Sequence, residues 1–324
     1  MPLLEISGLK TYYYVDVGVI KAVNDVDLVL NKGECLGIAG ESGCGKSTLA
    51  LSILRLIKPP GRIVGGKILF KDVDLLSLKM EEMRKIRWHK IAMVFQGAMN
   101  ALNPVHTIRD QIVEAIVNHL DYSKTEAEKK AAALLKSVGL NSSVLRSYPH
   151  ELSGGMKQRA LIAMALSCDP EILIADEPTT ALDVVTQAQI LMLLKDLQRQ
   201  RGLSIIVISH DLSILAQICD KIAIMYAGKI VEYADVETIY VKPAHPYTTA
   251  LINAFPSVRG PKKPLSILAG EPPNMINLPP GCPFHPRCPS ALEICCKVEP
   301  KMVQLDREHY VTCHLYGGHA RKES

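Results

Sequence analysis

The residues best suited to chemistry lie in the stretch GESGCGKS, residues 40–47, which fits the pattern G-x-x-x-x-G-K-[ST] without a mismatch. Its three glycines let the backbone curl so that successive N–H groups face inward and bind phosphate oxygens, and a following helix adds its dipole. Lys46 is placed to reach the β- and γ-phosphates of a nucleotide, and the Ser47 hydroxyl suits Mg²⁺. The predicted nucleotide-binding residues here are Gly40, Ser42, Gly43, Cys44, Gly45, Lys46, Ser47 and Thr48.

A second acidic site follows in PEILIADEPTTALD, residues 170–183. Asp176 ends an apolar run and can hold Mg²⁺ through water, and Glu177 is placed to polarise an attacking water. Phosphoryl transfer depends mainly on positioning and electrostatics, so one carboxylate and one metal ion contribute much. The alternative is an ordinary acidic pair at a helix N-terminus, which the phosphate-binding loop in the same chain disfavours.

The elements that must position these residues are also visible. The runs CLGIAG and ILIA predict buried strands before each motif, and STLALSILRLI predicts a helix after the loop. Residues 125–140 predict another helix that Gly139 ends. SIIVISH and DKIAIMYAGKIVEYA predict closing strands, with AGK as the turn. The apolar face of the helix over 125–140 is Ala127, Ala131, Leu134, Leu135 and Val138.

Between the two motifs lies HELSGGMKQRALIAMALSCDP, in which a Ser-Gly-Gly turn precedes Asp176 by 23 residues. With this order of motifs, residues 3–235 resemble the ATP-binding-cassette ATPases. The resemblance implies an α/β P-loop fold with an antiparallel β-subdomain and a helical subdomain, and ATP with Mg²⁺ as its ligands. It implies a nucleotide-binding domain over 1–235, with the helical subdomain at about 96–165.

The resemblance also assigns roles position by position. Gln96 would contact Mg²⁺ and the attacking water, and Asp183 would lie in the D-loop at a dimer seam. His210 would contact the γ-phosphate, and Glu177 would act as general base. Ser47, Gln96 and Asp176 would hold the metal. The signature motif, which would contact ATP bound to the opposite cassette, is Ser153, Gly154, Gly155 and Met156, with Met156 standing where the general family has Gln.

An aromatic residue that stacks on adenine is expected near the N-terminus, within TYYYVDVGVIKAVNDVDL. Three tyrosines compete for this place. Counting back from AVND favours Tyr13, and the other two read as residues of a sheet surface.

The composition changes after residue 235, where prolines accumulate. Proline breaks helices and cannot donate to a sheet. We therefore expect residues 236–324 to form a small, loop-rich extension with little room for its own core, which would require a staple.

The segment HPYTTALINAFP, residues 245–256, is similar to one found after the cassette in ATP-binding subunits of dipeptide and oligopeptide importers. Met156 also fits that group. The resemblance implies ATP-driven peptide import with two transmembrane permease subunits, a second related cassette and an extracytoplasmic binding protein. Nickel and glutathione importers share much of this pattern and stay open as alternatives, as does a non-transport cassette ATPase.

Cysteines cluster near the C-terminus. Cys282, Cys288, Cys295 and Cys313 have the spacing C-x5-C-x6-C-x17-C, and four thiolates suit zinc or a four-iron cluster. The wide spacing between the cysteines favours the four-iron cluster, which is larger than a zinc ion. The resemblance to peptide importers implies a [4Fe–4S] cluster, with Zn²⁺ and unligated thiols as alternatives. Cys296 competes with Cys295. Arg287 and Lys297 are expected to offset the charge of the cluster.

The bulk properties limit the remaining classes. The chain has 324 residues, 48% apolar and 22% charged residues, and a net charge of +4. This mild and dispersed charge, with only 5% aromatic residues, disfavours nucleic-acid binding. The N-terminus lacks the features of a signal peptide and no apolar run approaches the length of a spanning helix. We expect a peripheral protein at the cytoplasmic face of the cell membrane.

Overall fold

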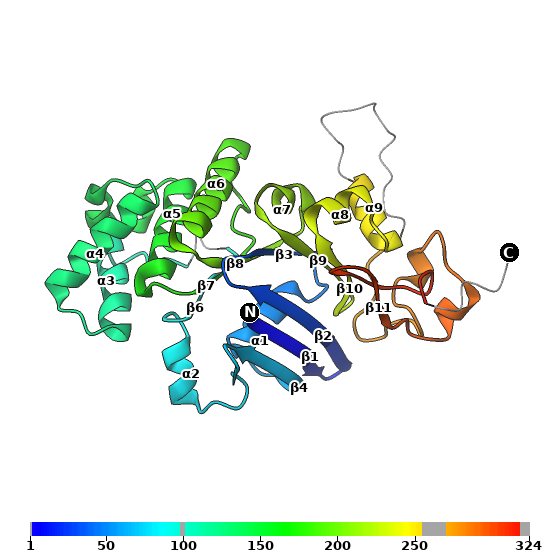
Figure 1. Ribbon diagram of the computed structural model, residues 1–324. Helices are drawn as coiled ribbons and strands as arrows, with labels where there is room; N and C mark the ends of the chain where they lie inside the picture. The colour runs from blue at the N-terminus through cyan, green and yellow to red at the C-terminus, as the bar shows by residue number, and fades with distance from the viewer. Residues whose placement is uncertain (1, 98–100, 255–269, 318–324) are drawn as a thin grey trace. The chain divides into compact units, whose positions relative to one another are not determined.

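The computed structural model describes residues 2–97, 101–254 and 270–317, which form two compact units (Figure 1). The first unit draws its described residues from 1–3, 30–35 and 74–208, and the second from 4–29, 36–73 and 209–324. Neither unit is a continuous stretch of chain, since the chain passes between them several times.

The first unit contains three parallel strands. They are β6 (Ile91–Val94), β7 (Ile172–Asp176) and β8 (Ser204–Ser209), in the order β6-β7-β8. Ile172 lies opposite Ile91 on one side and opposite Ser204 on the other. Every residue of β7 and β8 is buried, as expected for strands that are covered on both faces. The strand predicted before Asp176 is therefore confirmed.

Helices make up the rest of the first unit. They are α2 (Met80–Ile86), α3 (Ile108–His119), α4 (Lys124–Ser137), α5 (Gly154–Ala165) and α6 (Val184–Arg201), with short 3-10 turns at Ser142–Arg146, Pro149–Glu151 and Leu166–Cys168. Helices α3, α4 and α5 pack on one another (Figure 1). No helix within the described ranges combines the length and apolarity needed to cross a bilayer.

Helix α4 follows its sequence signals. Ser123 caps it and forms a reciprocal capping box with Glu126, and Gly139 takes a positive φ of 75° just after the helix ends. All five residues of the predicted apolar face are buried. This helix and its buried face are confirmed.

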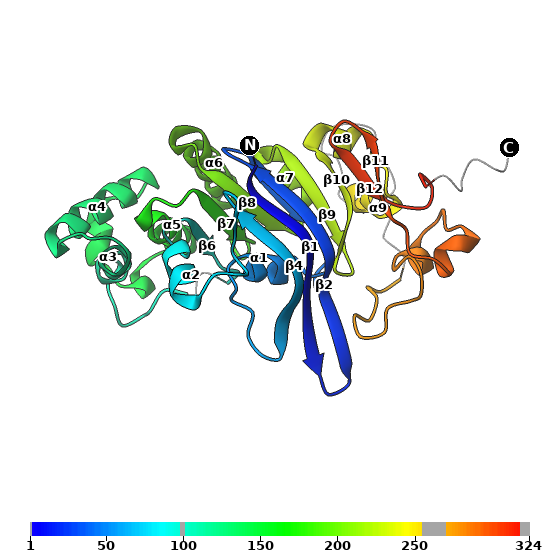
Figure 2. The same ribbon diagram turned by 60° about the horizontal axis from the view of Figure 1, so that its bottom comes forward.

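The second unit contains an antiparallel layer. Strand β1 (Pro2–Val15) lies between β2 (Gly18–Asn31) and β4 (Gly61–Phe70), as Figure 2 shows. The β1–β4 pair is antiparallel, with Leu4 opposite Phe70 and Tyr13 opposite Gly61. The short strand β5 (Val73–Asp74) follows β4.

A second group of strands in this unit runs in the order β11-β12-β10-β9-β3. It comprises β3 (Cys35–Ala39), β9 (Lys221–Tyr226), β10 (Lys229–Asp235), β11 (Met302–Asp306) and β12 (His309–Thr312). Only β3 and β9 pair in parallel; the other pairs are antiparallel. Ala227 and Gly228 form the tight turn between β9 and β10 with positive φ, which confirms the predicted hairpin.

The remaining elements of the second unit are short helices. They are α1 (Lys46–Ile53), α7 (Leu212–Ile218), α8 (Val236–Val241) and α9 (Pro246–Ala254), with 3-10 turns at His285–Arg287 and Glu293–Cys296. Helix α1 begins directly after the loop at 40–45, as predicted. In the predicted extension, the β11–β12 hairpin was not foreseen. It continues the sheet beside β10, with Val311 opposite Glu232.

A buried carboxylate ties this extension to β10. Glu232 is completely buried, and its two oxygens accept hydrogen bonds from the backbone N–H groups of Ala244 and His245, at 2.7 and 2.8 Å. The ring Nε2 of His309 donates to the same carboxylate at 2.9 Å. Because these donors come from two separate segments of the chain, 244–245 and His309, Glu232 fixes both the start of α9 and strand β12.

The ring of His245 should make the stability of the protein sensitive to acid. Its Nδ1 accepts a hydrogen bond from the Tyr247 N–H at 3.0 Å, and burial lowers its pKa from 6.5 to about 3. Between these values the unfolded chain binds the extra proton, so the free energy of unfolding falls as the pH drops below 6.5.

We expect His245→Asn, whose amide oxygen can replace the Nδ1 acceptor, to reduce this sensitivity. Between pH 6 and pH 5 the unmodified chain should lose about 1 kcal/mol more than the variant, measured by urea unfolding at each pH. Equal losses in the two proteins would show that His245 does not carry the effect.

Candidate nucleotide-binding and cysteine sites

The loop before α1 has the curled backbone that its sequence predicted. Gly40, Gly43 and Gly45 have φ values of 152°, 79° and 111°. A Cβ on Gly40 would lie 2.2 Å from the Met225 carbonyl oxygen, and one on Gly45 would lie 1.9 Å from that of Ala22. The loop is therefore seated against β9 on one side and β2 on the other, where only glycine fits.

Lys46 begins α1 and folds back over the loop. Its Nζ donates to the carbonyl oxygens of Gly40 and Glu41, at 2.7 and 2.8 Å, and the side chain is buried. The thiol of Cys44, a residue of the loop, is also buried, and this burial is the main cause that raises its pKa. Ser42 and Gly43 are exposed, and Ser47 and Thr48 are half-buried. The loop thus presents its backbone and Ser47 to solvent, as an anion-binding loop must.

In the first unit, the ends of the neighbouring strands β6 and β7 bring three predicted residues together. Asp176 is the buried last residue of β7, and Glu177 follows with a φ of 47°. The Glu177 carboxylate accepts hydrogen bonds from the Gln96 amide at 3.0 Å and from the Thr180 hydroxyl at 2.8 Å. Thr180 was not among the predicted site residues. The two bonds hold the carboxylate of the predicted general base in one orientation.

The predicted signature and D-loop residues also meet in this unit. Ser153 caps α5 by accepting from the Met156 N–H, and Asp183 caps α6 by accepting from the Thr186 N–H and hydroxyl at 2.9 and 2.6 Å. The hydrogen bonds from Thr186 lower the pKa of Asp183. A Cβ on Gly155 would lie 2.6 Å from Cγ2 of Thr186. The second signature glycine is thus required by the close approach of α5 to the start of α6.

The other predicted nucleotide contacts lie in the second unit. His210 directly follows β8 and is exposed. Tyr13 is half-buried on β1, and its ring edge fills the space above Gly61, where a Cβ would meet it at 2.6 Å. By contrast, the Tyr12 hydroxyl donates to Asn24, and Tyr14 is exposed beneath the guanidinium of Arg62. The three tyrosines therefore have different surroundings, and only Tyr13 packs against β4 at Gly61.

The four cysteines of the C-terminal pattern lie near one another. The pKa of Cys282 is raised to about 11, first by burial and then by the nearby thiols of Cys295, Cys313 and Cys288. The Cys282 N–H also donates to the Cys295 carbonyl at 2.8 Å. All nine cysteines are free thiols. Within the described ranges, no three Cys, His, Asp or Glu side chains converge closely enough for a single metal ion, so metal binding here stays a prediction.

The structure distinguishes the two adjacent cysteines 295 and 296. Cys295 is 7% exposed and contributes to raising the pKa of Cys282, Cys288 and Cys313. Cys296 is exposed, and its Sγ donates to the Glu293 carbonyl oxygen at 3.0 Å. Cys295 is therefore the residue of the pair that can join the group. Cys35, Cys168 and Cys219 are also buried.

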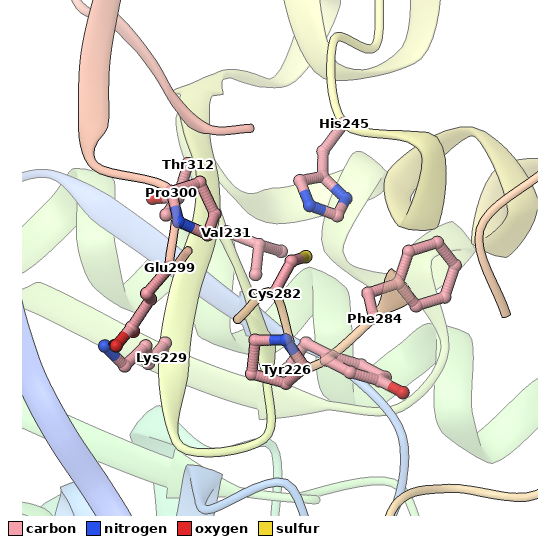
Figure 3. A pocket seen from close by; sticks show the side chains of 10 residues that line it. Tyr226, Lys229, Val231, His245, Cys282, Phe284, Glu299, Pro300 and Thr312 are labelled. Carbon is pink, nitrogen blue, oxygen red and sulfur yellow. The ribbon is translucent and has the colours of Figure 1, made fainter. Parts of the chain in front are cut away.

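Next to the cysteines is a small aromatic cavity, shown in Figure 3. Tyr226, His245 and Phe284 line it together with Cys282. The Tyr226 and Phe284 rings meet edge to face at 5.2 Å between centroids. Its volume of about 10 Å³ holds no more than one water molecule, so it is a packing defect and not a ligand site.

Arg287, which the sequence suggested would offset the charge of a cluster, has an acidic partner of its own. Its guanidinium forms two hydrogen bonds to the carboxylate of Glu41, at 2.7 and 2.9 Å. Lys297 is exposed. Sequence reasoning missed Glu41 and Arg287 as partners because they are 246 residues apart and no local pattern links them.

The glycine loop leading into α1, the acidic pair after β7 and the Ser-Gly-Gly start of α5 define a P-loop ATPase of the cassette type. Two family models match the chain. One describes "ABC transporter" and covers residues 23–180; the other describes "Oligopeptide/dipeptide transporter, C-terminal region" and covers residues 231–295.

Similar proteins and solved structures point to the same family as the two family models. The chain is 43% identical to the dipeptide transport ATP-binding protein DppD of Caldanaerobacter subterraneus, covering 97% of each. It is 44% identical to the oligopeptide transport ATP-binding protein OppD of Escherichia coli, covering 92% of this chain and 89% of that protein. A dimeric bacterial ABC transporter cassette, MJ0796, matches 72% of this chain and 98% of its own with 31% identity and a TM-score of 0.65. The chain therefore belongs to the ATP-binding subunits of ABC transporters.

The contact between Gly155 and Thr186 yields a prediction about the first unit. Gly155→Ala should lower the free energy of unfolding by about 1–3 kcal/mol, because the new Cβ overlaps Cγ2 of a threonine whose hydroxyl is held by Asp183. Thr186→Ser removes that methyl and keeps the hydroxyl, so adding it to Gly155→Ala should restore most of the loss.

Thermal unfolding of the two single variants and the double variant measures this effect. If Gly155→Ala were equally destabilising with and without Thr186→Ser, the methyl overlap would not be its cause.

Proposed function

We propose that this chain is the ATP-hydrolysing subunit of an importer of dipeptides or oligopeptides. The observation that carries the proposal is the occurrence, in one chain, of the cassette motifs and of an extension that matches the C-terminal region of oligopeptide and dipeptide transporters. The identity to peptide transport ATP-binding proteins along almost the whole chain supports it.

ATP binding is assigned to the loop at 40–48 and to Tyr13. The inward-facing N–H groups and Lys46 would bind the phosphates, and the Tyr13 ring would stack on adenine. Ser47, Gln96 and Asp176 would hold Mg²⁺, which supplies positive charge that stabilises the transferred phosphoryl group. A buried carboxylate at a strand end and a hydroxyl in the first turn of a helix are hard oxygen donors that suit this ion.

Hydrolysis is assigned to Glu177 as general base. Its carboxylate is held by Gln96 and Thr180, so it can accept a proton from water without first reorienting. His210 would contact the γ-phosphate. The signature residues 153–156 and Asp183 would act across a seam with a second cassette, a proposal supported by the dimeric form of the similar cassette MJ0796.

The free energy of ATP hydrolysis would drive transport by membrane partners. We propose that the chain binds two transmembrane permease subunits at the cytoplasmic face of the membrane and pairs with a related cassette. An extracytoplasmic peptide-binding protein would deliver the substrate. Nickel and glutathione are the competing cargoes, and a cassette ATPase outside transport is the competing class. Nucleic acid is not proposed as a partner.

We also propose that Cys282, Cys288, Cys295 and Cys313 hold a [4Fe–4S] cluster, with Zn²⁺ as the alternative. The mutual influence of the four thiols and the burial of Cys295 support this assignment. The donor set is all thiolate, which both a four-iron cluster and zinc accept. Bound metal would add folding free energy to an extension that contains little apolar core.

The transporter proposal is tested by purifying this chain with the membrane subunits and partner cassette that bind it, and reconstituting them in vesicles. We expect ATP-dependent uptake of a labelled dipeptide or oligopeptide. Glu177→Gln should lower ATP turnover by at least about a hundredfold while ATP binding persists, because the amide cannot accept the proton.

Glu308→Gln is the matched control, since Glu308 is an exposed acid far along the chain from these motifs. Full turnover in Glu177→Gln would contradict its role as base. Uptake of nickel or glutathione in place of peptide would contradict the cargo, and purification without membrane subunits would contradict the transporter.

The adjacent cysteines test the cluster. After anaerobic purification the unmodified chain should contain about four iron and four sulfide per chain. Cys295→Ser should lose most of both, whereas Cys296→Ser should retain them, because Cys295 is buried near the other thiols and Cys296 is exposed. A colourless protein with one equivalent of zinc would overturn the cluster.

A further inference from the structure

The P-loop contains an acidic residue at a position where negative charge opposes its ligand. Glu41 is the second residue of the loop, immediately after Gly40. A carboxylate beside a phosphate-binding nest repels a polyanion such as ATP, unless another group neutralises it. The structure supplies that group from the C-terminal extension.

Arg287 neutralises Glu41 through a two-pronged ion pair. Its Nη1 and Nη2 donate to Oε2 and Oε1 of Glu41, at 2.7 and 2.9 Å. The Arg287 side chain is only 7% exposed and that of Glu41 23% exposed, so water screens the pair weakly. This pair differs from a surface ion pair in both geometry and burial.

Arg287 is itself held by Tyr226 and by the backbone turn that contains it. Its guanidinium lies 6.0 Å from the centre of the Tyr226 ring, and Nη1 also donates to the Tyr226 hydroxyl at 3.4 Å. The chain around Arg287 forms a 3-10 turn in which the Arg287 N–H donates to the Phe284 carbonyl. Contacts other than the one with Glu41 therefore orient the guanidinium.

Tyr247 holds the backbone of Glu41. Its hydroxyl accepts a hydrogen bond from the Glu41 N–H at 2.9 Å, and the whole side chain is buried. The Tyr247 ring packs at 4.6 Å from Tyr226 and 5.3 Å from Phe284, between centroids. This tyrosine belongs to the His-Pro-Tyr segment that marks the extension.

Every polar group of Glu41 thus has a named partner. The carboxylate binds Arg287, the N–H binds Tyr247, and the carbonyl oxygen accepts from Nζ of Lys46. Lys46 is the phosphate-binding lysine of the loop. The extension and the lysine are therefore linked through one residue.

We propose that Arg287 and Tyr247 are positioning residues for the P-loop, so that the extension completes the ATP site of its own cassette. Arg287 removes the repulsion between Glu41 and the phosphates and keeps its carboxylate turned away from them. Tyr247 fixes the start of the loop. The inference rests on ATP binding in the proposed function, and it requires neither the peptide cargo nor the metal.

The test is a double-mutant cycle on the full chain, with the dissociation constant of ATP measured by equilibrium titration with a fluorescent ATP analogue. Arg287→Gln should weaken ATP binding about tenfold, because the Glu41 charge is left unneutralised near the phosphates. In the Glu41→Gln background the same change should weaken binding less than about twofold, because no charge remains to be neutralised.

Conservative variants separate positioning from folding. Arg287→Lys keeps the charge but loses the fork, and should restore part of the affinity. Tyr247→Phe removes only the acceptor for the Glu41 N–H and should weaken ATP binding severalfold. The fold should be unchanged, as measured by far-UV circular dichroism.

The matched control is Glu308→Gln. Glu308 pairs with Lys221 at 3.0 Å and so also links the extension to β9, but at the start of that strand, opposite Leu36 and away from the loop. It should leave the ATP dissociation constant unchanged.

Unchanged ATP affinity in Arg287→Gln would overturn the inference, as would an equal loss in the presence and absence of Glu41→Gln. Both results differ from failure of the proposed function, in which the unmodified chain itself would not bind ATP.

Discussion

The structure depends first on a steric constraint at two glycines. At Gly40 and Gly45 a side chain would collide with the carbonyl oxygens of Met225 and Ala22, at 2.2 and 1.9 Å. Because both glycines have positive φ and press against neighbouring strands, the loop has one place and one shape. That shape sets where α1 begins and where Lys46 points. The binding of an anion at this loop is thus decided by backbone packing before any charged side chain contributes.

A second constraint brings the extension to the same loop. Glu232 on β10 accepts bonds from the chain at 244–245 and from His309 on β12, and thereby anchors both ends of the extension. From this anchor, Tyr247 and Arg287 reach Glu41. The His-Pro-Tyr segment therefore has a physical task besides marking a group of transporters. A metal bound by the cysteines would fix the short segment that carries Arg287, which gives the proposed staple a reason.

Much of this could be predicted because the signals are local. The sequence of α4 shows a capping residue, an apolar face and a terminal glycine within a few turns. The unbroken apolar run of β7 indicates that the strand is buried. The β11–β12 hairpin was missed because the surrounding prolines dominated the reading of the extension. Arg287 was assigned to the cysteines because Cys288 is its neighbour in sequence, whereas its guanidinium reaches a residue near the other end of the chain.

The sequence by itself determined the kinds and order of the motifs, since a glycine loop, an acidic strand end and a capped helix are each specified by residues within a few positions of one another. It favoured Cys295 over Cys296 only through the family resemblance, and no local pattern indicated a partner for Glu41. Only the tertiary structure decided these, because the direction of a side chain in a 3-10 turn and the pairing of Glu41 with Arg287 depend on packing between distant segments. Such packing has no counterpart in local spacing.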